Sequence, residues 1–391
     1  MKEMSKEEKI QQILTRGVES AVKKEALEKA LNSTKKLRVK FGIDPTAPDL
    51  HLGHAVVLRK LRAFQDLGHK LVLIIGDFTA QIGDPTGKNK TRPPLTEKEV
   101  KQNMKNYLKE AGRIIDLKKA EVHYNSKWLK KLQGGKLIQL LSLVSVQQMM
   151  ERDDFSNRMK AGETIRIHEL LYPIMQGYDS VMVKADIECG GSDQTFNLLV
   201  GRTLMEKFEM IPQNVLTTPL LEGLDGEKKM SKSIGNYIGL SEASDQMFGK
   251  IMSLPDGLMK KYFELCTNFS ISEIKNILDG SPRDAKVSLA YQITVLYHGE
   301  KKAEEAREKF DRLFSKKEIS EKDFSMIPEI AGGNNVIYVV ESRVAKSNSE
   351  ARRLIEQGGL EVNGEKDRSP HTTRQKGDVL KIGKHGFFKI K

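Results

Sequence analysis

The sequence contains little cysteine. Its 391 residues include two, Cys189 and Cys266, which lie far apart in the chain. They belong to no Cys-x-x-Cys or Cys/His spacing, so neither a disulfide framework nor a structural zinc site is indicated. A reducing compartment is therefore expected, and the residue pattern predicts no metal site.

Long apolar runs are also missing. No stretch of about 18 consecutive apolar residues, the length that crosses a bilayer as a helix, occurs in the chain. The N-terminal stretch MKEMSKEEKIQQIL alternates charged and apolar residues and lacks the continuous apolar core of a signal peptide. We therefore expect a cytoplasmic protein with no membrane partner.

Acidic residues are outnumbered by basic ones. There are 65 Lys and Arg against 53 Asp and Glu, which gives a net charge of +12 and a pI near 9.3. This excess favours a polyanionic partner, although composition alone does not separate a nucleic acid from a membrane surface. A chain of this length is expected to form two or three domains.

The first half of the chain shows an α/β pattern. Residues 37–43 alternate apolar and polar side chains, and residues 71–76, LVLIIG, form an apolar run typical of a strand buried on both faces. Between them a helix is expected from about His51, with Asp49 as its N-cap. Strand, helix and strand in this order predict a doubly wound parallel sheet with right-handed crossovers.

Other stretches read as helical. Residues 5–31 predict one amphipathic helix, helical patterns continue from Glu97 to about Arg202, and residues 243–314 predict a separate helical domain. A polar stretch with Pro328 and a Gly pair then has the composition of a linker. The remaining residues predict a small α+β unit, in which an Arg-rich helix at 348–357 precedes three short strands.

Two short motifs suggest nucleotide chemistry. His51-Leu52-Gly53-His54 lies at a strand-to-helix junction, where free amides favour phosphate and two imidazoles can donate to it. Lys229-Met230-Ser231-Lys232-Ser233 follows a turn-rich stretch, and its ammonium groups suit a leaving pyrophosphate. Taken alone, the histidine motif could be a surface or helix-capping feature, and the lysine motif could be a solvated basic loop. The occurrence of both motifs in one chain favours nucleotide binding.

HLGH and KMSKS resemble the two signature motifs of class I aminoacyl-tRNA synthetases, both of which contact ATP. The stretches FGIDPTAPDLHLGH, IGDPTGK and GGSDQ, together with Tyr172-x3-Gln176-x2-Asp179, resemble the tyrosyl-tRNA synthetase family over nearly the whole chain. The resemblance implies a Rossmann-type catalytic domain that activates L-tyrosine with ATP, releases pyrophosphate and loads tRNA(Tyr). It also implies a homodimer, and Mg2+ that arrives with ATP without a dedicated protein site.

The resemblance also assigns residues. Asp84, Tyr172 and Gln176 match the residues that bind the α-ammonium group of tyrosine. Asp179 matches the aspartate that binds the phenolic hydroxyl, and bound phenylalanine would leave this buried acceptor unpaired. The implied ATP site consists of Asp44, Pro45, His51, Gly53, His54, Gly191, Asp193, Gln194, Lys229, Ser231 and Lys232. The implied catalytic residues are Thr46, His51, His54, Lys229 and Lys232.

One position departs from the family pattern. Where many members place a tyrosine against the substrate hydroxyl, this sequence has Lys40. Either its ammonium snorkels away from the pocket and takes no part, or the pocket chemistry is altered. In both cases hydroxyl recognition is expected to depend mainly on Asp179.

The C-terminal unit resembles a small RNA-binding domain first seen in a ribosomal small-subunit protein. The resemblance includes an SRxxKSxSEARRLIEQGG-like stretch. The unit carries Arg343, Lys346, Arg352 and Arg353 close together, which suit phosphate contacts to tRNA, the alternative being a solvated helix face. The expected domains are a catalytic domain with helical insertion at 1–240, an anticodon-arm-binding helical domain at 241–320, a linker at 321–332 and the RNA-binding domain at 333–391.

Three rival functions share parts of this pattern. A tryptophanyl enzyme has the same signatures but normally lacks the Tyr-x3-Gln-x2-Asp arrangement and the terminal RNA-binding unit. A nucleotidyltransferase for small metabolites also uses an HxGH turn, but has no need of RNA-binding appendages. A non-catalytic RNA-binding relative is disfavoured by the intact motifs.

Overall fold

The computed structural model describes residues 4–45, 49–86, 96–314, 329–330, 333–342, 344–345, 347–383 and 387–391. Contacts group the chain into two units, Met1–Glu242 with Ser253–Leu289, and Ala243–Met252 with Ala290–Lys391. Among the helices of the described ranges, none has the length and apolarity to cross a membrane. The three-domain division stays a prediction.

The first unit is built on a six-stranded sheet with the order β1-β6-β5-β2-β3-β4. The parallel strands are β2 (Arg38–Ile43), β3 (Lys70–Ile75), β4 (Glu121–Tyr124), β5 (Ile187–Gly191) and β6 (Asn214–Thr218). The chain proceeds outward from β2 to β4, then returns to add β5 and β6 on the other side of β2. The expected doubly wound sheet is confirmed, and its switch point, where such sheets bind ligands, lies between β2 and β5.

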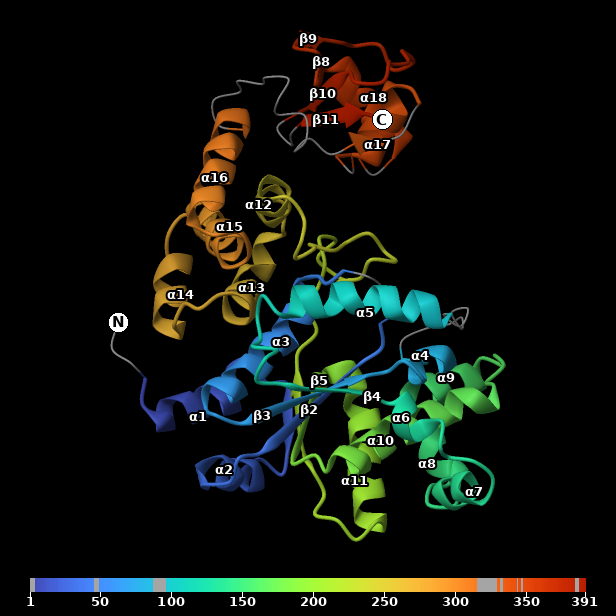
Figure 1. The fold of residues 1–391 in the computed structure, drawn as a ribbon. Coiled ribbons are helices and arrows are strands. Elements are labelled where there is room, and N and C mark those ends of the chain that lie inside the picture. The colour runs from blue at the N-terminus through green and yellow to red at the C-terminus, as the bar shows by residue number, and fades with distance from the viewer. Residues whose placement is uncertain are drawn as a thin grey trace. The chain divides into compact units, whose positions relative to one another are not determined.

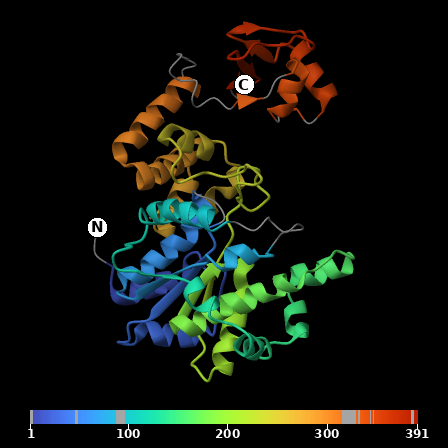
Figure 2. The same ribbon diagram turned by 45° about the vertical axis from the view of Figure 1, so that its right-hand side comes forward.

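Helices cover both faces of this sheet. Figure 1 shows α3 (Leu52–Asp66) on one face and α10 (Ile167–Val183) and α11 (Thr195–Lys207) on the other, and the turned view of Figure 2 keeps this arrangement. The remaining helices are α1 (Lys6–Thr15), α2 (Lys24–Asn32), α4 (Thr79–Ile82), α5 (Glu97–Ala111), α6 (Ser126–Leu129), α7 (Gly135–Leu141), α8 (Val146–Met150), α9 (Asp153–Lys160), α13 (Met259–Cys266) and α14 (Ile271–Leu278).

Three local predictions are wrong. The single helix expected at 5–31 is interrupted after Thr15, where Gly17 takes a φ of +58° and the strand β1 (Ser20–Val22) pairs antiparallel with β6. The helical stretch expected from Glu97 contains the strands β4 and β5. The N-cap of α3 is His51 and not Asp49. Strand pairing with distant residues overrides helical periodicity in the first two cases.

The second unit holds α12 (Ser244–Met252), part of α15 (Pro282–His298) and α16 (Glu300–Phe314), in agreement with the expected helical region. Its C-terminal part has α17 (Asn335–Glu341) and α18 (Asn348–Glu356) beside a sheet ordered β7-β11-β10-β8-β9. These strands are β7 (Glu329–Ile330), β8 (Leu360–Val362), β9 (Glu365–Lys366), β10 (Val379–Ile382) and β11 (Phe387–Ile390). The predicted α+β unit is confirmed.

Candidate active site

A cavity of about 380 Å³ opens at the switch point, beyond the carboxyl ends of β2 and β5. It brings together nearly all the residues predicted for ATP and tyrosine: Asp44, His51, Gly53, His54, Asp84, Tyr172, Gln176, Asp179, Gly191, Asp193, Gln194, Lys229, Ser231 and Lys232. Pro45 is described but does not line it, and Thr46 lies outside the described residues. The volume of the cavity lies in the range of pockets that bind small ligands.

The HLGH residues form one wall of the cavity at the start of α3. Burial lowers the pKa of His51 to about 2 and that of His54 to about 4, helped by the positive charge of nearby lysines. His54 Nδ1 accepts a hydrogen bond from the backbone N–H of His51 at 3.3 Å. The neutral imidazole therefore carries its proton on Nε2, as a donor. A Cβ on Gly53 would lie 3.0 Å from His51 Nδ1, so a side chain here would crowd the imidazole.

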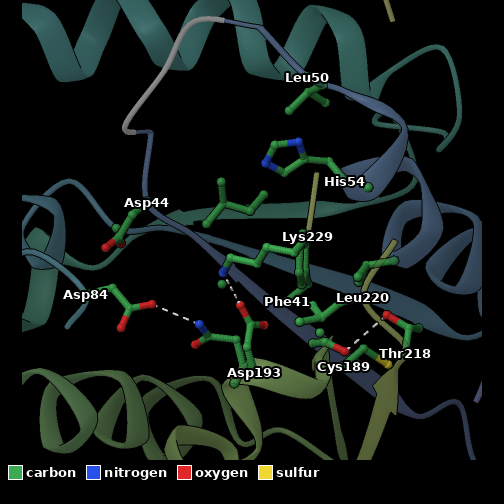
Figure 3. Close-up of a pocket in the computed structure, with 18 of the residues that line it drawn as sticks. Phe41, Asp44, Leu50, His54, Asp84, Cys189, Asp193, Thr218, Leu220 and Lys229 are labelled. Atoms are coloured by element: carbon green, nitrogen blue, oxygen red, sulfur yellow. Dashed lines mark hydrogen bonds and ion pairs between the residues drawn. The ribbon is translucent and has the colours of Figure 1, made fainter. Parts of the chain in front are cut away.

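The KMSKS residues also line the cavity, next to the segment that carries HLGH. Lys229 Nζ lies 2.9 Å from Asp193 Oδ2, and Figure 3 shows it reaching that carboxylate across the cavity. Lys232 Nζ donates to the carbonyl of Asp49 at 2.7 Å. The turn itself is held by Asn236, whose Oδ1 accepts from the N–H of Ser231 at 2.8 Å. Sequence reasoning missed Asn236, since no pattern marks a residue whose role is to shape a neighbouring turn.

Acceptor groups gather at the side of the cavity where Asp44 and Asp84 lie. Asp84 accepts from the N–H of Thr86 at 2.9 Å and from Gln194 Nε2 at 2.8 Å. Asp44 accepts from Tyr172 Oη at 2.9 Å, and burial raises its pKa to about 7. This side is suited to an ammonium group because it gathers two carboxylates, although Asp84 already has a cationic neighbour, the Arg152 guanidinium at 3.6 Å.

Gly76, directly after β3, and Thr79, the first residue of α4, were also missed. Thr79 Oγ1 donates to Asp44 Oδ1 at 2.7 Å. A Cβ built on Gly76 would lie only 1.9 Å from the same oxygen, so the glycine makes room for the carboxylate. The only sequence signal was their position at or just after the carboxyl end of a predicted strand.

Asp179 lies deep in the cavity, 3% exposed, on α10. It accepts from Trp128 Nε1 at 2.7 Å and from Asn125 Nδ2 at 3.2 Å. Burial raises its pKa to about 7, against the lowering effects of Lys40 and of these two donors. Asn125 and Trp128 were missed because β4, the strand that precedes them, was read as helix. Trp128 is the single tryptophan of the chain, and this rarity is the one sequence feature that could have pointed to it.

Lys40 lies outside the cavity wall, as the first alternative expects, but its ammonium does not reach solvent as a snorkelling side chain would. Its side chain is 0% exposed and is not part of the cavity wall. Its Nζ lies 2.8 Å from Glu188 Oε1, on the neighbouring strand β5. The carboxylate draws the ammonium inward, away from both the solvent and the cavity.

A parallel sheet whose strand ends carry an HLGH helix start and a KMSKS loop around one cavity is typical of class I aminoacyl-tRNA synthetases. The family described as tRNA synthetases class I (W and Y) matches residues 31–315, and the S4 domain matches residues 336–380. Tyrosine–tRNA ligase of Thermotoga maritima is 48% identical over 99% of this chain and 98% of its own. The corresponding enzyme of Carboxydothermus hydrogenoformans is 47% identical over 97% of both chains. The chain therefore belongs to the tyrosine–tRNA ligase family.

Solved structures agree at the level of the fold. A C-terminally truncated mitochondrial tyrosyl-tRNA synthetase of Aspergillus nidulans has a TM-score of 0.65 at 23% identity, covering 80% of this chain and 95% of that one. The Archaeoglobus fulgidus tyrosyl-tRNA synthetase, complexed with L-tyrosine, has a TM-score of 0.62 at 21% identity, with coverage of 78% and 100%. At such identities the likeness supports the fold alone.

Proposed function

We propose that this chain activates L-tyrosine with ATP and transfers it to the 3′-terminal ribose of tRNA(Tyr). One observation supports the proposal: a single cavity is lined by Asp84 and Tyr172, by the buried carboxylate of Asp179 and by the two lysines of the KMSKS loop. Asp84 and Tyr172 suit the ammonium end of tyrosine, and Asp179 suits its phenolic hydroxyl. The lysines suit a polyphosphate.

In the first step the tyrosine carboxylate attacks the α-phosphorus of ATP, the bond to pyrophosphate breaks, and tyrosyl-adenylate forms. The nucleophile arrives ionised, so no general base is required. Rate acceleration then comes from positioning and from donors aimed at the pyrophosphate. We assign the donor roles to His54 Nε2, Lys229 and Lys232, and we propose His51 and Thr46 as further catalytic residues.

We propose that the ribose of ATP is bound by Asp193 and Gly191. The rest of the ATP site is proposed to consist of Gln194, Ser231, Asp44, Pro45 and Gly53. Gln176 is proposed to help bind the ammonium group of tyrosine. Mg2+ is proposed to arrive bound to the phosphate oxygens of ATP. In the second step a ribose hydroxyl of tRNA attacks the adenylate carbonyl and AMP leaves. Because the substrates are those of translation, we propose a cytoplasmic location.

The test is amino-acid-dependent exchange of labelled pyrophosphate into ATP without tRNA, run with each of the twenty amino acids. Exchange with tyrosine alone is expected. Exchange with tryptophan would move the specificity to the sister enzyme, and no exchange with any amino acid would reject adenylation. Asp179→Asn is the companion variant, because it should relax the rejection of phenylalanine.

We also propose a homodimer. Three exposed apolar side chains, Ile138 (69%), Val146 (63%) and Ile167 (78%), lie on α7, α8 and α10, helices that share one hydrophobic cluster. Apolar surface gathered on neighbouring helices favours a protein contact. Ile167→Asp should therefore raise the monomer fraction in sedimentation velocity, whereas the same change at exposed Ile271, on α14, should not.

A further inference from the structure

Lys40 and Glu188 form an ion pair in the interior of the first unit. They are direct partners in the register of β2 and β5, and both are 0% exposed. A buried pair of this kind loses the hydration of two charges, and an apolar pair of similar volume is often equally stable. Stability alone is therefore a weak reason for charges at these two positions.

The pair is bonded to the helix that carries the tyrosine-site residues. Lys40 Nζ donates to the carbonyl of Gln176 at 2.9 Å and to Ser180 Oγ at 2.7 Å. Ser180 Oγ donates in turn to Glu188 Oε2 at 3.1 Å. Asp179 lies between these contacts in the sequence of α10, and its side chain faces the cavity while Lys40 stays behind the wall.

We propose that Lys40 and Glu188 act as a specificity-determining positioning pair, which sets the charge state of Asp179 so that one carboxylate reads the phenolic hydroxyl. This inference rests on the tyrosine placement proposed above. The pair touches no substrate atom. It acts through α10 and through the electrostatic potential at Asp179, with Lys40 favouring the ionised carboxylate and Glu188 opposing it.

The charges around Asp179 support opposite roles for the two residues. Burial raises the pKa of Asp179 to about 7; Lys40 is the largest influence that lowers it, and Glu188 raises it. Trp128 and Asn125 lower it further through their hydrogen bonds. An aspartate titrating near neutrality is sensitive to any change in a neighbouring charge.

Other titratable groups of the cavity also face this region. Asp44 and Tyr172 both interact electrostatically with Asp179, and burial raises the pKa of Asp44 to about 7 as well. A pH profile for tyrosine alone would mix the two aspartates. The ratio of kcat/KM for tyrosine to that for phenylalanine cancels much of the Asp44 contribution, because only tyrosine carries the hydroxyl.

The experiment measures this ratio in pyrophosphate exchange across the acid and neutral pH range, since kcat/KM reports groups of the free enzyme. The ratio should be high where Asp179 is ionised and should fall as pH drops through its pKa. Lys40→Met should move the midpoint up by about one pH unit, and Glu188→Gln should move it down. The double variant should return it close to the wild-type midpoint.

The double variant also guards against misfolding, because it leaves no unpaired buried charge. Lys35→Met is the matched control, since Lys35 pairs with Asp186 but is 63% exposed. Midpoints that stay fixed or move in the same direction in both single variants would overturn the proposal. If Asp179→Asn leaves rejection of phenylalanine unchanged, the tyrosine placement itself fails.

Discussion

At the scale of residues, the carboxylates and the lysines of the cavity are held differently. Asp84 and Asp179 each accept hydrogen bonds from neutral donors, so their positions are set before a substrate arrives. Lys232 instead pairs with Asp49, whose side chain is 51% exposed. Such a pair contributes roughly 0–1 kcal/mol, so a polyphosphate can replace Asp49 at little cost.

Lys232→Ala should slow adenylate formation on the order of 100-fold, because a donor to the leaving pyrophosphate is lost. Tyrosine affinity should change little, since the tyrosine-site residues lie on other elements. Single-turnover kinetics and equilibrium tyrosine binding measure the two effects. The adjacent exposed Lys228 is the control; equal slowing in Lys228→Ala would remove the specific role.

At the scale of elements, the two signature motifs are joined by backbone pairing. The N–H of Leu52 donates to Ile238 O at 3.0 Å, and the N–H of Leu240 donates to Leu50 O at 2.9 Å. Glu110, on α5 and 6% exposed, accepts both from the N–H of Leu50 and from Ser241 Oγ. One carboxylate thus ties the start of the HLGH helix to the segment that follows the KMSKS loop.

Glu110→Gln should leave one of these two donors facing an amide N–H. We expect a loss of about 1–3 kcal/mol in the free energy of unfolding. We also expect a lower kcat for pyrophosphate exchange with an unchanged tyrosine Kd. Denaturant unfolding and exchange kinetics test this, with Glu206→Gln as the control, because the Glu206 side chain on α11 is exposed. A stability loss without any fall in kcat would make Glu110 purely structural.

At the scale of the whole molecule, the net charge of +12 is consistent with the proposed binding of tRNA, a polyanion. Of the four predicted tRNA-binding residues, Arg352 and Arg353 are exposed on α18, while Arg343 and Lys346 lie outside the described residues. The core of this domain, which includes Tyr338, Ile355 and Leu380, does not involve either exposed arginine. Their replacement should therefore leave the fold intact.

The double variant Arg352→Ala/Arg353→Ala should weaken tRNA binding and reduce the slope of log K against log salt by roughly one per lost phosphate contact. Tyrosine-dependent pyrophosphate exchange, which needs no tRNA, should stay at the wild-type rate. Binding titrations at several salt concentrations measure the slope. Arg352→Lys/Arg353→Lys should retain most of it, and an unchanged slope in the alanine variant would assign this helix face to solvent.

Much of the architecture and most of the cavity were predictable from the sequence alone. The strands at β2 and β3 and the helix between them followed from local periodicity, and the contiguous HLGH and KMSKS motifs carried their chemistry with them. The spacing of apolar and polar residues along an element predicts which of its side chains are buried, because apolar residues recur on the face that packs against the core.

Only the tertiary structure decided which buried groups meet. β1 pairs with β6 almost 200 residues away, Lys40 meets Glu188, and Trp128 reaches Asp179. None of these partners is marked by a local pattern, since strand order and register set each distance. The sequence by itself determined the elements and the reacting groups, whereas the sheet's register decided that Lys40 is an internal ion-pair partner and not a surface lysine.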